Sequence, residues 1–233
     1  MEFAPQNIQQ EKVRFEKVED VLNVIDFSLI ESILKEMALK SGVSEEDFNS
    51  RKFQNKEDIL LKALGKDGPF ATANDGMIIL NTDKLTEFAR IDPSKIFSIL
   101  IHEEVHCSAY NEYSEVKSDT VNGVQRKTLH GSYQGLNEAL TEIIAYTAQV
   151  EYRQRSGDST FSPNTHVYAD TIGVLGSIAH EIAQKTGVDL DKVMEAFVQA
   201  YFTGFDLSSA DFFGQLDEDL KMRMKMFGRA MFI

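Results

Sequence analysis

The sequence predicts a mainly helical α+β domain with a small antiparallel sheet. The first observation is that apolar residues recur at helical spacing over several long segments, and the second is one pair of short apolar segments separated by Asp75-Gly76. The third is size, because 233 residues, 42% of them hydrophobic, are enough for one sizeable core. We expect an N-terminal helical segment over residues 1–65 and a larger domain over residues 66–233, together forming one compact unit.

Helices are predicted where apolar residues follow a period of 3.6. The predicted helices are 18–39, 94–109, 136–153, 166–184, 190–202 and a last one that begins at Ser209 or Asp211. Two helices divided at 26–28 are the alternative for the first of these, and residues 83–89 are predicted to be a short helix or a turn. Residues 52–68 are ambiguous, with a short helix over 58–64 as one interpretation. Asp92 or Ser94 is expected to cap the helix at 94–109, and Asp189 the helix at 190–202.

A hairpin is predicted for residues 70–74 and 77–81, because both residues of an Asp-Gly turn tolerate positive φ. Residues 111–130 are rich in polar side chains and are predicted to form a surface excursion.

Composition excludes several classes of protein. A net charge of −13 argues against a nucleic-acid backbone or an anionic membrane as partner. No apolar run approaches the roughly 20 residues of a membrane span. The single cysteine rules out an intrachain disulfide framework, and the polar N-terminus has no apolar signal core. These features predict a cytoplasmic protein. They carry no signal for the oligomeric state.

The strongest motif is His102-Glu103-Glu104-Val105-His106 within the predicted helix at 94–109. Two histidines four residues apart lie one turn apart, about 6 Å along the helix axis, and can bind one metal ion. Glu103 lies at the edge of the same face, so the segment has the HExxH pattern of two zinc ligands and a general base. Glu104 and Ser108 stand where such helices usually have uncharged and apolar residues. We expect Glu104 to point away from the metal, which costs little if that side of the helix is wet.

A zinc site of this kind needs a third protein ligand, and three glutamates are candidates. Glu112 stands where the metzincin class of zinc peptidases has a third histidine, but the glycine of the required turn is replaced by Ala109. Glu138 and Glu142 share a helical face with no Lys or Arg between positions 134 and 146, so a nearby cation would relieve their repulsion. One of the two can bind the metal while the other orients a ligand histidine.

The combination of His102-Glu103-x-x-His106 with Asn137-Glu138-x-x-x-Glu142 resembles the gluzincin zinc metallopeptidases, both thermolysin-like enzymes and the anthrax lethal-factor protease domain. The resemblance covers roughly residues 68–150. It implies a zincin-like metalloprotease fold, His102, His106 and Glu138 as the Zn²⁺ ligands, and Glu142 as the residue that orients a ligand. It also implies that residues 77–81 form a substrate-binding edge strand.

The predicted function is zinc-dependent hydrolysis of a peptide or protein substrate, with Glu103 as the general base. Tyr133, Tyr168 and His166 are candidates for stabilising the oxyanion. Cys107 is predicted to be a buried thiol, His180 a packing residue and His130 a loop residue. Two alternatives stay open: a non-catalytic domain that binds zinc and peptides, and a helical interaction protein with a chance HExxH motif.

Overall fold

The computed structural model describes residues 14–51, 53–74, 77–109, 111–112, 121–122, 134–164, 169–204 and 207–226. The helices are α1 (Val18–Leu22), α2 (Phe27–Lys40), α3 (Glu45–Asn49), α4 (Thr82–Ile91), α5 (Pro93–Ser108), α6 (Gln134–Ser156), α7 (Ala169–Thr186), α8 (Leu190–Thr203) and α9 (Glu218–Met226). Short 3₁₀ turns are η1 (Lys56–Asp58), η2 (Leu207–Ser209) and η3 (Phe213–Gln215). The strands are β1 (Ile59–Lys62), β2 (Ala71–Asn74), β3 (Met77–Asn81), β4 (Asn111–Glu112) and β5 (Val121–Asn122). The prediction of a mainly helical α+β chain with a small sheet is confirmed.

The prediction of one continuous helix over 18–39 is wrong, and the alternative of two helices is confirmed, with the break over residues 23–26. The side chain of Asp26 accepts a hydrogen bond of 3.0 Å from the backbone N–H of Leu29, so α2 begins at Phe27. An aspartate in this position satisfies one of the free N–H groups at the start of a helix.

The three-stranded sheet has the order β1-β3-β2, and it differs from prediction in three respects. The hairpin is confirmed by the antiparallel register of Asn74 with Met77, although the turn residues 75–76 lie outside the described part of the chain. However, β1 pairs parallel to β3, so the sheet is mixed rather than antiparallel, and residues 59–62 are a strand instead of a helix. β3 is consequently the central strand, and β1 and β2 form the edges of the sheet. The prediction that residues 77–81 form an edge strand is therefore wrong.

The start of α5 and the start of the last helix differ from prediction. Pro93 occupies the first turn of α5, where its missing N–H costs nothing, and Asp92 makes no capping bond through its side chain. The hydroxyl of Ser94 instead accepts from the backbone N–H of Ser162. α9 begins at Glu218 because Asp217 accepts from the N–H of Leu220, while residues 207–215 hold the two 3₁₀ turns. The predicted cap of α8 by Asp189 is confirmed.

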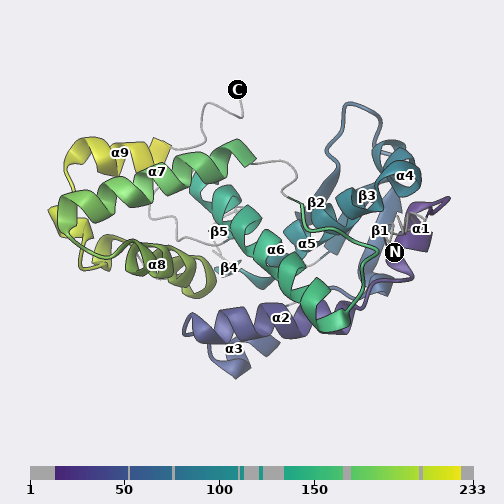
Figure 1. Cartoon of the computed structure of the whole chain (residues 1–233), viewed down its shortest axis with the longest axis horizontal. Coiled ribbons are helices and arrows are strands. Elements are labelled where there is room, and N and C mark those ends of the chain that lie inside the picture. The colour runs from purple at the N-terminus through teal and green to yellow at the C-terminus, as the bar shows by residue number, and fades with distance from the viewer. Residues whose placement is uncertain are drawn as a thin grey trace, which may run out of the picture.

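The long helix α6 crosses the middle of the molecule and packs against α2, α5, α7 and α8 (Figure 1). The sheet and α4 lie on one side of it, and α7, α8 and α9 lie on the other (Figure 1). α5 and α6 meet along buried aliphatic side chains, and each such side chain contributes about 1.5–3 kcal/mol of burial free energy. This packing fixes the face of α5 that carries the two histidines against the start of α6.

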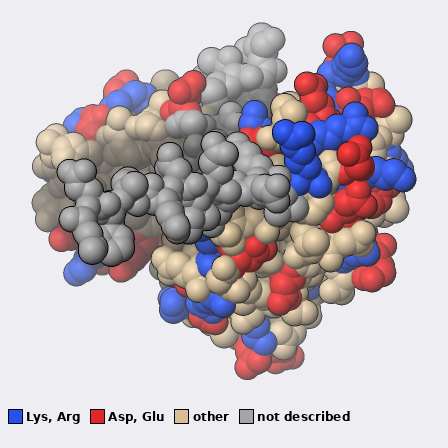
Figure 2. Space-filling model, turned by 45° about the vertical axis from the view of Figure 1, so that its right-hand side comes forward, with Lys and Arg blue, Asp and Glu red and all other residues tan. Residues whose placement is uncertain are grey.

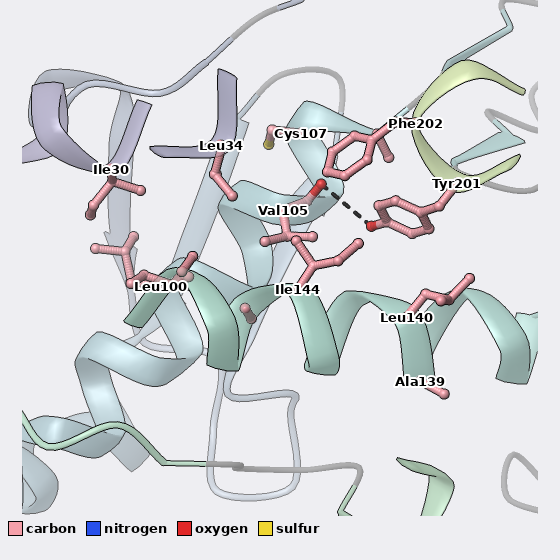
Figure 3. Close-up of a cluster of buried hydrophobic side chains, with 14 of the residues drawn as sticks. Ile30, Leu34, Leu100, Val105, Cys107, Ala139, Leu140, Ile144, Tyr201 and Phe202 are labelled. Atoms are coloured by element: carbon pink, nitrogen blue, oxygen red, sulfur yellow. Dashed lines mark hydrogen bonds between the residues drawn. The ribbon is translucent and has the colours of Figure 1, made fainter. Parts of the chain in front are cut away.

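The N-terminal helices share the core of the rest of the chain. Ile30 and Leu34 of α2 are buried in the same cluster as Leu100 of α5 and Ile144 of α6 (Figure 3). The hydroxyl of Tyr152 in α6 accepts from the N–H of Asp26 at 3.0 Å. The predicted boundary at residue 65 stays a prediction, but the two parts pack against one another through these contacts. In the part of the chain that the structure describes, no helix is both long and apolar enough to cross a membrane.

Candidate metal centre

α5 and α6 bring His102, His106 and Glu138 together around one point. The Nε2 atoms of His102 and His106 lie 3.2 Å apart. The Oε2 atom of Glu138 lies 3.4 Å from each of these two nitrogens. Three donor atoms from two helices therefore form a nearly equilateral triangle.

The size of this triangle fits a metal ion with tetrahedral coordination. Bonds of about 2.0–2.1 Å from a tetrahedral Zn²⁺ to nitrogen and oxygen place any two ligand atoms about 3.3–3.4 Å apart. The observed separations of 3.2–3.4 Å match that edge length. The group can hold a metal ion, and its three side chains would supply three of the four ligands of a tetrahedral ion.

The electrostatics of the group also favour a cation. Burial lowers the pKa of His102, yet the carboxylates of Glu138 and Glu142 overcome this and raise that pKa to about 10. Burial raises the pKa of Glu138, but His106 and His102 bring it well below its usual range. The carboxylate of Glu138, held ionised beside two imidazoles in a buried place, attracts positive charge strongly, because the surrounding dielectric constant is low.

Glu142 lies behind the first of the two histidines. Its Oε2 atom is 2.9 Å from Nδ1 of His102, and its side chain is buried. A carboxylate at this distance accepts the Nδ1 proton, which leaves the Nε2 lone pair directed at the group. The structure thus places Glu138 at the centre and Glu142 behind it, in the arrangement that the resemblance implies for these two residues.

The second histidine is supported by residues that sequence reasoning missed. Thr141 of α6 has its Oγ1 atom 3.4 Å from Nδ1 of His106. The same oxygen lies 2.7 Å from the hydroxyl of Tyr201, which belongs to α8 and is fully buried. Thr141 stands three residues after Glu138, so helical spacing was a usable signal. Tyr201 had none, because only tertiary packing brings α8 to this place.

Glu103 and Glu104 have opposite environments. Glu103 is partly exposed and makes no hydrogen bond or ion pair with the residues that the structure describes. Glu104 is fully buried at 0% exposure, so the side of α5 on which it lies is not wet. Its Oε2 accepts from the backbone N–H of Gln54 at 3.4 Å, because the segment before η1 covers this side of α5. Burial raises the pKa of Glu104 well above its usual value.

Most of the other residues that the sequence singles out lie away from the described site or outside the described residues. Tyr133, His166, Tyr168 and His130 lie outside the described residues, as does the side chain of Glu112. The prediction that Cys107 is a buried thiol is confirmed, and burial raises its pKa. His180 is exposed on α7, where its Nε2 lies 2.9 Å from the side-chain nitrogen of Gln184, so the packing role predicted for it is wrong.

Comparison of the chain with protein-family models, with curated proteins and with solved structures finds no match in any of the three. The case for a function therefore rests on the residues and their geometry.

Proposed function

We propose that the protein is a zinc-dependent peptide hydrolase of the gluzincin type, acting in the cytoplasm on a peptide or protein substrate. The observation that carries the proposal is the triangle of His102, His106 and Glu138, whose edges of 3.2–3.4 Å suit a tetrahedral ion. Two imidazoles and one carboxylate are a donor set that Zn²⁺ favours, and three protein ligands with one open position are typical of catalytic rather than structural zinc. The zincin-like fold is part of this proposal.

Zinc bound there would lower the pKa of a water molecule and polarise the scissile carbonyl group. Glu103 follows the first ligand directly in the helix, and its carboxylate is not held by any described residue. It is therefore free to accept a proton from water at one of its oxygens and to pass that proton to the leaving amine. Glu142 and Thr141 keep the two imidazoles oriented meanwhile.

Two other functions fit the residues less well. A domain that binds zinc and peptides without cutting them needs the three ligands but no base, so the retention of Glu103 favours catalysis. A helical interaction protein with a chance HExxH motif gives no reason for Glu138, 32 positions after His106, to contact both histidines, or for Glu142 to contact His102. Nucleic acid is a poor partner for a chain of net charge −13. On the face in Figure 2, the Lys and Arg side chains are interrupted by Asp and Glu.

The test is metal analysis of the protein purified without chelator, joined with cleavage of a random peptide library. Glu103→Gln should retain zinc and lose cleavage by about 10²- to 10⁴-fold, as expected for the loss of a general base. Glu87→Gln is the matched control, because Glu87 is exposed on α4, and it should cleave like the wild type. Zinc without cleavage in the wild type would favour the binding domain, and no zinc at all would favour the interaction protein.

A further inference from the structure

We propose that Tyr201 and Arg51, which do not coordinate the metal, position His106 for metal binding through the hydroxyl of Thr141. The inference rests on the metal centre proposed above. It gives α8 and the N-terminal segment a role in that centre, although both lie far from the HExxH motif in sequence.

The orientation of His106 determines which of its ring nitrogens carries the proton. Its Nε2 atom faces the other two donor atoms, so a neutral imidazole that binds through Nε2 carries its proton on Nδ1. Oγ1 of Thr141 lies 3.4 Å from this Nδ1 atom. The threonine oxygen must therefore accept from this ring if it is to hold the orientation of the imidazole.

The proton on Thr141 decides the direction of the next bond. Oγ1 lies 2.8 Å from the carbonyl oxygen of Asn137, which can only accept, so the threonine gives its single proton there. It then accepts from both of its other partners, the imidazole of His106 and the hydroxyl of Tyr201 at 2.7 Å. Both lone pairs and the proton of Thr141 are used, which fixes the oxygen in one place. Removal of the Tyr201 hydroxyl releases one of these three constraints.

The position of Tyr201 is set by α5 itself. The phenol hydroxyl also lies 3.4 Å from the carbonyl oxygen of Val105, the residue before His106 (Figure 3). At 2.7 Å the contact with Thr141 is the shorter, and we assign the proton to it. Tyr201 thus touches both the helix that carries His106 and the residue that orients it.

Arg51 fixes the distance between α5 and α8. Its guanidinium donates from Nη2 to the carbonyl oxygen of Phe202 at 2.7 Å and from Nη1 to the carbonyl oxygen of Ser108. Both carbonyls lie in the last turns of their helices, where they lack helical partners and carry partial negative charge. Ser108 follows His106 by two residues, and Phe202 follows Tyr201 directly. The bridge therefore sets the spacing of the two side chains that Thr141 connects.

The experiment compares metal affinity in variants of the full chain, measured by competition with a zinc chelator and by the visible absorption of the Co²⁺-substituted protein. Thr141→Val should weaken zinc binding about 10-fold or more. Tyr201→Phe should weaken it about threefold to fivefold, as for the loss of one ordinary hydrogen bond. Arg51→Lys should act in the same direction, because an ammonium cannot span two carbonyls as a planar guanidinium does. Thr141→Ser, which keeps the hydroxyl, should restore affinity and spectrum.

Tyr152→Phe is the matched control for Tyr201→Phe. Tyr152 is also buried, and its hydroxyl also takes part in one long-range hydrogen bond, yet it is not connected to the histidines. Both variants should lower the urea midpoint to a similar extent, while only Tyr201→Phe changes the affinity and the Co²⁺ spectrum. If the wild type binds zinc and Tyr201→Phe and Thr141→Val bind it equally well, the inference is overturned and the metal centre stands. If the wild type binds neither ion, the proposed function fails and this inference fails with it.

Discussion

The Nδ1 atom of His102 lies 2.9 Å from Oε2 of Glu142, and both side chains are buried. His106, one turn further along α5, has a threonine hydroxyl in the equivalent place. The two histidines are therefore held differently, one by an ionisable carboxyl group and the other by a neutral hydroxyl. A carboxylate makes its imidazole more basic and holds it more strongly than a hydroxyl does.

From this relationship we expect Glu142→Ala to weaken zinc binding about 10- to 100-fold, because His102 loses the partner that fixes its tautomer. Glu142→Gln keeps an acceptor but removes the charge, so its loss should be smaller. Chelator competition measures both. Glu151→Ala is the control, since Glu151 lies on the same helix but pairs with Arg155 at the surface. Equal affinity in Glu142→Ala and the wild type would show that this contact does not support the metal.

Loss of either histidine should remove the metal. We expect His102→Ala and His106→Ala each to reduce the zinc content of the purified protein sharply, because each supplies one of the three ligand atoms. The added thermal stability on zinc binding should vanish as well, since an ion that binds only the folded state stabilises it. His180→Ala on the exposed face of α7 should keep both properties. Full zinc content in the two ligand variants would rule out the assignment.

Buried Glu104 makes the stability of the protein depend on pH. Its pKa is raised in the folded state, so the folded protein holds a proton that the unfolded chain has released. Stability then falls as the pH rises from the ordinary glutamate pKa toward the folded value, by at most about 1.4 kcal/mol per pH unit. Glu104→Gln, which keeps a neutral side chain of similar shape, should unfold at higher urea concentration than the wild type at pH 8, with a smaller difference at pH 5.

The control for this prediction is Glu46→Gln, because Glu46 is exposed on α3. It should leave the difference in urea midpoint between pH 5 and pH 8 unchanged. A wild-type protein as stable at pH 8 as at pH 5, with Glu104→Gln giving no gain, would mean that the carboxylate is solvated in solution.

Periodicity and local capping predicted most of the helices, because those signals lie within a few residues of one another. The cap of α8 by Asp189 is one example. β1 was missed because Ile59 to Lys62 is too short to show a period, and only its pairing with β3 makes it a strand. The burial of Glu104 was also beyond local reasoning. That side of α5 is covered by the segment around Gln54, which no pattern in the helix reveals.

The site likewise combines contacts that local spacing predicts with contacts that only tertiary packing makes. Spacing of four residues paired His102 with His106 and Glu138 with Glu142, and the structure places the two pairs against one another. Tyr201 reaches the site across 60 positions of sequence, through the packing of α8 on α6. A single buried tyrosine has no pattern of its own.

The choice between Glu138 and Glu112 as third ligand separates two classes of zinc peptidase. Glu138 lies 3.4 Å from both histidine nitrogens, so Glu138→Ala should nearly abolish zinc binding. Glu112→Ala should bind zinc like the wild type, because the ligand triangle is complete without it and Ala109 replaces the glycine that a metzincin turn requires. A zinc titration of the two variants measures this. If Glu112→Ala loses the metal while Glu138→Ala keeps it, the gluzincin assignment is wrong, and the chain has a metzincin-like site with a carboxylate as its third ligand.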